Sequence, residues 1–175
     1  IDERVRALVE RARHCLHEVL LPQLREIGVR ILNVTELEPD ERAKVDAFFE
    51  GQVFPVLTPL AVDPGHPFPY ISNLSLSLAV ELRDPERGEV RFARVKVPKS
   101  LPRWVPTGRP HSYVPLEALI AERLDALFPG MQILGAHLFR LTRYSDLEIS
   151  PTEEPEDLLA TIEEQLFQRR FGEVV

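Results

Sequence analysis

A proline-rich run of apolar residues limits what this 175-residue chain can fold into. Residues 54–70 contain five prolines within fifteen consecutive positions, together with the aromatic side chains of Phe54, Phe68 and Tyr70. A proline removes a backbone hydrogen bond, so neither a helix nor a central strand can run through this segment. Because the segment is also rich in apolar side chains, we expect a stiff loop that packs against another domain or subunit through these three aromatic residues.

The clearest strand signal lies directly after this run. Residues 74–82 alternate apolar and polar side chains, which is typical of a half-buried strand. A turn is expected at residues 84–88 and a partner strand at 90–97, so the pattern predicts an antiparallel hairpin. The apolar alternation shifts between Phe92 and Val95, which predicts a β-bulge in the second strand.

Helical periodicity dominates the beginning of the chain. Apolar residues recur every three to four positions over residues 2–27, which predicts a leading helix that ends at Gly28 and is kinked or divided at Pro22. Further helices are expected from Pro39, over 116–128 and after Ser150, with strands at 29–34, 111–114 and 133–142 and a loop at 98–110. Helices and strands that mix without strict alternation indicate an α+β fold with a largely antiparallel, mixed sheet.

The composition describes a globular, acidic protein. Hydrophobic residues make up 44% and charged residues 28%, so the chain can bury a core. The net charge of −7 argues against a nucleic-acid-binding protein and against the whole surface holding a polyanion. The single cysteine, Cys15, excludes an internal disulfide and fits the reducing cytoplasm, where we expect the protein to reside.

Candidate catalytic and metal-binding residues are few. No glycine-rich phosphate loop occurs in the sequence. His14, Cys15 and His17 are close enough on one helix to share a metal, but one helix does not supply a closed site, so an ordinary helix surface is favoured. His66 and His137 could accept a phosphate or transfer a proton, although a structural, hydrogen-bonded role is favoured for each. We therefore assign no catalytic, cofactor-binding or metal-binding residue.

Arginines near the end of the predicted final strand are the best candidates for anion contacts. Arg140 and Arg143 lie three positions apart, and Arg169 and Arg170 follow near the carboxyl end. A regular strand would point Arg140 and Arg143 to opposite faces, which weakens a joint site. Arginines that are solvated or paired with nearby acids are the favoured alternative.

Several unusual segments together resemble one protein family. The longest is residues 53–76, VFPVLTPLAVDPGHPFPYISNLSL. The others are FARVKVP at 92–98, LFPGM at 127–131, GAH at 135–137, FRLTR at 139–143, DLE at 146–148 and RFGEVV at 170–175. In this order they resemble the middle, or head, region of bacterial polyphosphate kinases of the histidine-phosphorylating type.

The resemblance implies a function for the longer enzyme. Such enzymes reversibly transfer the terminal phosphate of ATP to inorganic polyphosphate, through a phosphohistidine and with Mg²⁺. It further implies that the phosphorylated histidine and most contacts to ATP and Mg²⁺ belong to domains that follow Val175. Residues 1–175 are then the head domain, with residues 1–28 as a leading helical segment.

The resemblance also implies what the chain itself contributes. We expect it to serve dimerisation and domain assembly, and to be inactive alone. Its expected partners are the remaining domains of the enzyme and further copies in a homo-oligomer, with polyphosphate as the substrate of the parent enzyme and membrane association of that enzyme left open.

Two other functions stay open at the level of sequence. The chain could be a stand-alone module that binds a polyanion or a protein, and salt-sensitive binding would identify a polyanion site. It could also be an unrelated small α+β enzyme, which would require a catalytic constellation that the sequence does not display.

Overall fold

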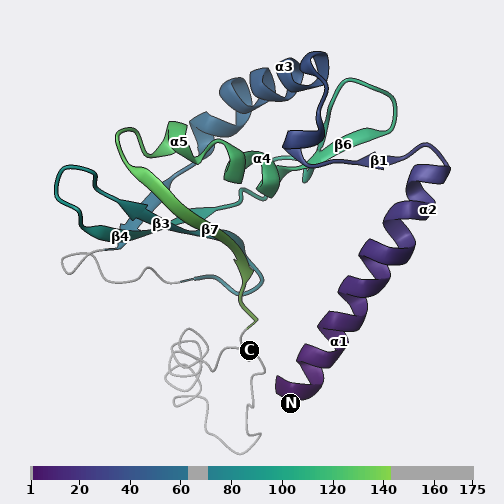
Figure 1. Cartoon of the computed structure of the whole chain (residues 1–175), viewed down its shortest axis with the longest axis horizontal. Helices are drawn as coiled ribbons and strands as arrows, with labels where there is room; N and C mark the ends of the chain where they lie inside the picture. Colours follow the sequence, from purple (N-terminus) through teal and green to yellow (C-terminus); the bar gives the residue numbers. More distant parts are fainter. Residues whose placement is uncertain (1, 63–70, 143–175) are drawn as a thin grey trace, which may run out of the picture.

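The computed structural model describes residues 2–62 and 71–142, which form two small sheets and several helices (Figure 1). The four-stranded sheet has the order β2-β4-β3-β7 and the three-stranded sheet the order β1-β6-β5. All strand pairs described are antiparallel except β1 with β6. The predicted α+β class, its largely antiparallel pairing and its leading amino-terminal helix are therefore confirmed.

The elements have the following bounds. The α-helices are α1 (Asp2–His14), α2 (Leu21–Glu26), α3 (Pro39–Phe48), α4 (Leu116–Glu122) and α5 (Leu124–Leu127). The π-helical and 3-10 segments are η1 (Cys15–Leu20), η2 (Val34–Glu36), η3 (Phe49–Val53) and η4 (Phe54–Val56). The strands are β1 (Arg30–Ile31), β2 (Pro59–Val62), β3 (Leu76–Arg83), β4 (Val90–Lys96), β5 (Trp104–Pro106), β6 (Ser112–Pro115) and β7 (Gln132–Arg140).

The leading helix runs without a gap through α1, η1 and α2, and its hydrogen bonding changes from π-helical to α-helical at Leu21, next to Pro22. The wider π-helical turns of η1 lie just before Pro22, whose ring nitrogen cannot donate to the preceding turn. The helix ends at Gly28, which has φ of +87°. The Gly28 amide donates to the Arg25 carbonyl at 3.0 Å and the Val29 amide to the Leu24 carbonyl at 2.8 Å, so this end is a Schellman motif.

The predicted hairpin is present, but its bulge is elsewhere. β3 and β4 pair in unbroken register from Ser77 with Lys96 to Arg83 with Val90, so the bulge predicted in β4 is wrong. The alternation shifts because β4 lies inside the sheet and buries three consecutive residues, Ala93 to Val95. The register shift instead separates Glu81 from Leu82, where β3 meets β7.

Two segments expected to be irregular contain short strands. β2 begins at Pro59 and forms an edge of the four-stranded sheet, where a missing amide hydrogen bond is tolerated. β5 lies within the predicted loop at 98–110 and is likewise an edge strand, paired with β6. The strand predicted at 29–34 is reduced to Arg30–Ile31, and the predicted helix after Ser150 lies outside the described residues.

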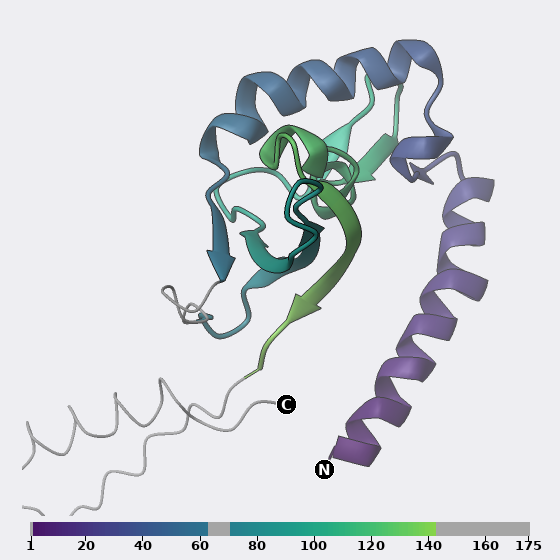
Figure 2. The same ribbon diagram turned by 60° about the vertical axis from the view of Figure 1, so that its left-hand side comes forward.

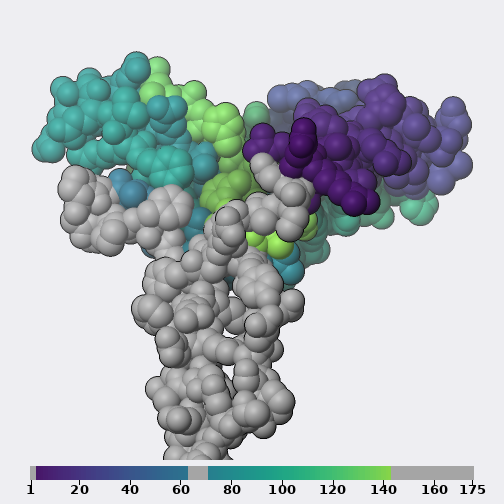
Figure 3. Space-filling view, turned by 90° about the horizontal axis from the view of Figure 1, so that it is seen from below, coloured from purple at the N-terminus to yellow at the C-terminus, as the bar shows by residue number. Residues whose placement is uncertain are grey.

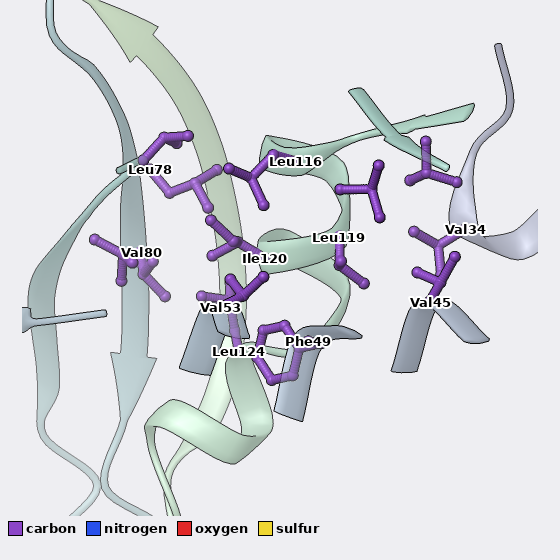
Figure 4. Close-up of a cluster of buried hydrophobic side chains, with 14 of the residues drawn as sticks. Val34, Val45, Phe49, Val53, Leu78, Val80, Leu116, Leu119, Ile120 and Leu124 are labelled. Atoms are coloured by element: carbon purple, nitrogen blue, oxygen red, sulfur yellow. The ribbon is translucent and has the colours of Figure 1, made fainter. Parts of the chain in front are cut away.

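The core surrounds α4, which lies between the four-stranded sheet and α3 (Figure 4). Leu116, Leu119 and Ile120 on α4 are fully buried. They fill the space between the sheet, represented by Val80, and η3, which begins at Phe49. Complete burial of one such side chain contributes about 1.5–3 kcal/mol to the stability of the fold. Because these side chains pack against both layers, α4 holds the layers together.

A buried carboxylate connects α3 to the three-stranded sheet. Glu41 has no exposed surface. Its Oε1 accepts hydrogen bonds from Thr107 Oγ1 at 2.8 Å and Ser112 Oγ at 3.2 Å, while its Oε2 accepts from the Glu38 amide at 3.3 Å. Arg109 Nε lies 3.7 Å from Oε1. The carboxylate therefore accepts hydrogen bonds both from the start of α3 and from the β5–β6 hairpin.

The hydrogen bonds determine the protonation of Glu41. Burial by itself raises the pKa of Glu41, but the hydrogen bonds from Thr107, the Glu38 amide and Ser112, with the charge of Arg109, lower it further than burial raises it. The net pKa is below its ordinary value of 4.5. Ionised Glu41 therefore stabilises the fold fully above that value, and this contribution is lost as the pH falls through the folded-state pKa.

We expect Glu41→Gln to lower the free energy of unfolding by about 1–3 kcal/mol at neutral pH, because the buried donors lose a charged acceptor. The difference from wild type should shrink as the pH falls below 4.5. Urea denaturation at several pH values measures both effects. Glu26→Gln, on the exposed surface of α2, is the matched control and should change stability little. A difference that does not depend on pH would contradict this account of Glu41.

Candidate functional site

A cavity of about 420 Å³ opens where β3 begins and β7 ends. We call it the cationic pocket. It is lined by the residues Leu74, Leu76, Val97, Pro98, Lys99, Leu101, Arg103, Leu116 and Arg140. Its volume lies within the range of roughly 300–1,000 Å³ that is usual for small-molecule sites.

Backbone hydrogen bonds bring the walls of the pocket together. Leu76 on β3 is paired with Arg140 on β7, and the Val97 amide donates to the Leu76 carbonyl at 3.0 Å. The Leu116 amide donates to the Arg103 carbonyl at 2.8 Å, which fixes the start of α4 against the segment before β5. Four stretches of the sequence, at residues 74–76, 97–103, 116 and 140, therefore converge on one opening.

An unusual backbone conformation shapes the rim. Leu74 has φ of +56°, in the left-handed region that non-glycine residues rarely adopt. Its amide donates to the Leu141 carbonyl at 2.9 Å, and its side chain is 51% exposed. Such strain persists only where surrounding contacts enforce it, and it often accompanies binding sites.

The charged residues of the pocket are all cations. Lys99, Arg103 and Arg140 line it, and no carboxylate is among its lining residues. Arg103 Nη2 donates to Glu117 Oε1 at 2.7 Å. No residue in the described part of the chain forms an ion pair with Lys99 or Arg140. Glu117 Oε2 is buried and has no hydrogen-bond partner among the described residues. The floor is apolar, with Val97 and Leu116 buried.

The structure places some of the predicted site residues and leaves others outside the described part. Arg140 lies in the cationic pocket, but Arg143 is outside the described residues. Phe68 and Tyr70, predicted as interface contacts, are also outside them. Phe54 lies in η4 and is 43% exposed, with its ring centroid 6.1 Å from that of Phe49.

The histidines do not form a metal site in the part that is described. His14, Cys15 and His17 are exposed on the leading helix. Within residues 2–62 and 71–142, no group of three or more histidine, cysteine, aspartate or glutamate residues could hold a metal ion. His137 is exposed on β7 opposite Ala79. His66 lies outside the described residues, and the hydrogen-bonded structural role favoured for His66 and His137 stays a prediction.

The sequence pattern does not predict two of the pocket cations. Lys99 and Arg103 lie in the segment expected to be a loop, and nothing in their spacing connects them with Arg140, about forty residues away. The signal available was the pair of cations between Pro98 and Trp104 in a mostly uncharged stretch. Only the pairing of β3 with β7 brings Arg140 to this position.

A second surface is formed by the leading helix. Its apolar positions recur every three to four residues and share one face. They remain exposed, at 42–56% for the large side chains Leu8, Val9, Leu16, Val19 and Leu20. The helix projects away from the two sheets in both ribbon views, and the space-filling view shows its side chains at the outer surface (Figures 2 and 3).

Known proteins resemble the chain closely. The model of the family described as "Polyphosphate kinase middle domain" matches residues 40–175. The chain belongs to this family. A polyphosphate kinase from Streptomyces coelicolor is 49% identical over 169 residues, covering 97% of this chain and 22% of the relative. One from Thermosynechococcus vestitus is 51% identical over 160 residues, covering 87% of this chain and 22% of the relative.

A solved structure agrees with this assignment. The crystal structure of polyphosphate kinase from Porphyromonas gingivalis matches with a TM-score of 0.72 and 28% identity. The match covers 93% of this chain and 28% of that chain. The chain therefore spans about a quarter of the length of these three relatives. None of its described helices is long and apolar enough to cross a membrane.

We expect Arg103→Ala to lower the free energy of unfolding by about 1–3 kcal/mol, because Glu117 would keep a largely buried carboxylate without its partner. The double variant Arg103→Ala/Glu117→Ala should recover part of this loss, since it removes the unpaired charge. Urea denaturation of wild type, both single variants and the double variant gives the coupling energy. Strictly additive losses would show that the pair contributes nothing.

Proposed function

We propose that this chain is the head domain of a polyphosphate kinase and that its role is dimerisation and domain assembly. The parent enzyme would reversibly transfer the terminal phosphate of ATP to inorganic polyphosphate through a phosphohistidine, with Mg²⁺. The catalytic histidines and most contacts to ATP and Mg²⁺ would belong to other domains. Family membership supports this proposal, since the relatives are named polyphosphate kinases and the matching family is their middle domain.

The exposed apolar face of the leading helix is the observation that carries the assembly role. None of the described side chains of α1, η1 and α2 is buried. An amphipathic helix gains most of its stability by burying its apolar face against a partner. A contiguous apolar surface of this kind on a folded protein marks a docking site. We assign its partner to the remaining domains of the parent enzyme.

The proline-rich segment supplies a second proposed contact. Phe54 at its start is exposed, although its ring also touches Phe49 in the core. We propose that Phe54, with Phe68 and Tyr70, contacts a neighbouring domain or a second copy of the chain. Prolines would reduce the conformational entropy that this segment loses on docking. The exposed Cys15 is compatible with a cytoplasmic enzyme, where thiols stay reduced.

We expect Leu16→Ala/Leu20→Ala to weaken assembly of the full-length parent enzyme by about tenfold or more. Both leucines are exposed in this chain, and the substitutions would remove the apolar contacts that they are proposed to make in the assembled enzyme. Alanine keeps the helix propensity high, so the helix itself should persist. Sedimentation measures the oligomer and thermal unfolding measures domain docking. Arg11→Ala/Glu18→Ala, which alters the opposite face and leaves the net charge unchanged, is the control. Equal behaviour of the two variants would refute a docking role for the apolar face.

We expect the 175-residue chain alone to form no polyphosphate from ATP and Mg²⁺, in an assay where the full-length parent enzyme is active. The reason is that phosphoryl transfer requires preorganised cations and a nucleophile, which we assign to other domains. Polyphosphate synthesis by the isolated chain would disprove this division of labour. His66→Ala and His137→Ala would then show which histidine acts.

A further inference from the structure

The cationic pocket has the chemistry of an anion site, although the chain as a whole is acidic. The net charge is −7, yet the three charged residues that line this cavity are Lys99, Arg103 and Arg140. A cluster of one sign in a concave site raises the local concentration of the opposite ion. We infer that this pocket binds an oligophosphate, meaning a run of linked phosphoryl groups.

The arrangement of the cations favours a multivalent anion. Lys99 follows β4, Arg103 precedes β5 and Arg140 ends β7, so the charges come from three walls of one opening. A single phosphate or carboxylate is compact and offers few anionic oxygens to these three walls. A chain of phosphoryl groups offers several anionic oxygens and can contact all three, with arginine binding two oxygens at once.

The cations differ in how free they are to bind. Arg103 is already held by Glu117 Oε1 at 2.7 Å, which orients its guanidinium at the rim. Lys99 and Arg140 are exposed and form no ion pair within the described residues. These two side chains therefore gain most from a ligand and lose least when they are replaced, which makes them suitable for a binding test.

The apolar floor strengthens this preference. Leu76, Val97, Leu101 and Leu116 line the same cavity as the cations. An apolar wall lowers the local dielectric constant and strengthens charge–charge attraction at the opening. The same floor could hold the nucleoside of a nucleoside triphosphate. The phosphate run is the chemistry that inorganic polyphosphate and ATP share, and binding measurements can separate the two sources.

The choice of a phosphate anion rests on the proposed function, because the relatives are named polyphosphate kinases. The cationic character of the pocket does not depend on it. Assembly of the parent enzyme is measured through its oligomeric state, which the pocket substitutions should leave unchanged. Failure of the assembly role and failure of the pocket are thus separate results.

The test is calorimetric titration of the full 175-residue chain with tripolyphosphate, with Mg²⁺-free ATP and with inorganic phosphate. We expect Lys99→Gln/Arg140→Gln to weaken tripolyphosphate binding about tenfold or more. The logarithmic dependence of affinity on salt, measured between about 50 and 200 mM, should also become less steep by about one to two. The single tryptophan, Trp104, lies next to Arg103 and provides a fluorescence signal for the same titration.

A matched control removes the same charge elsewhere. Arg83→Gln/Arg87→Gln alters two exposed arginines at the far end of the β3–β4 hairpin and should change the affinity less than about twofold. Circular dichroism verifies that both variants are folded. Equal losses in the two variants would overturn the proposal, because binding would then depend on net charge alone.

The ligands identify the source of the phosphate run. Tripolyphosphate binding as tight as ATP binding supports the inference and identifies the inorganic chain. Tighter ATP binding, with the same loss in Lys99→Gln/Arg140→Gln, supports it and identifies a nucleoside triphosphate. Binding of neither ligand overturns the proposal. Inorganic phosphate bound as tightly as tripolyphosphate overturns it as well, because the site would then not recognise a run of phosphates.

Discussion

The buried Glu41 carboxylate fixes how the three-stranded sheet is placed against α3. It lies on α3, but its hydrogen-bond donors Thr107 and Ser112 lie at the β5–β6 hairpin. A buried charge is costly unless its partners are supplied with good geometry. The three-stranded sheet must therefore sit at one position relative to α3. The parallel pairing of β1 with β6 continues the same contact, since the Arg30 amide donates to the His111 carbonyl at 2.8 Å.

Hydrophobic burial supplies the stability that this polar contact directs. α4 places Leu116, Leu119 and Ile120 between the four-stranded sheet and α3, and these side chains are fully buried. The apolar contacts tolerate many arrangements, whereas the Glu41 contact tolerates few. Leu116 also lines the cationic pocket, so the helix that joins the two layers forms part of the pocket wall.

The sequence was informative where one local pattern decides a structure. Alternation over residues 74–82 predicted β3, and the helix after Pro39 and the end at Gly28 were correctly placed from capping and proline rules. It failed where tertiary contacts decide. β2 and β5 are short edge strands whose prolines suggested loops, and the shifted alternation near Phe92 reflects a central strand and not a bulge.

The same division explains the candidate site. The sequence predicted Arg140 as an anion contact, and the structure places it in the pocket, but the sequence did not predict the cations that line the pocket with it. Lys99 and Arg103 join it through backbone hydrogen bonds between distant segments, and no periodicity in the sequence encodes that proximity. The acidic net charge is a sum over the whole chain, so it does not reveal that this one cavity is lined by cations. Charge in such a domain is informative only after the fold has shown which side chains share an opening.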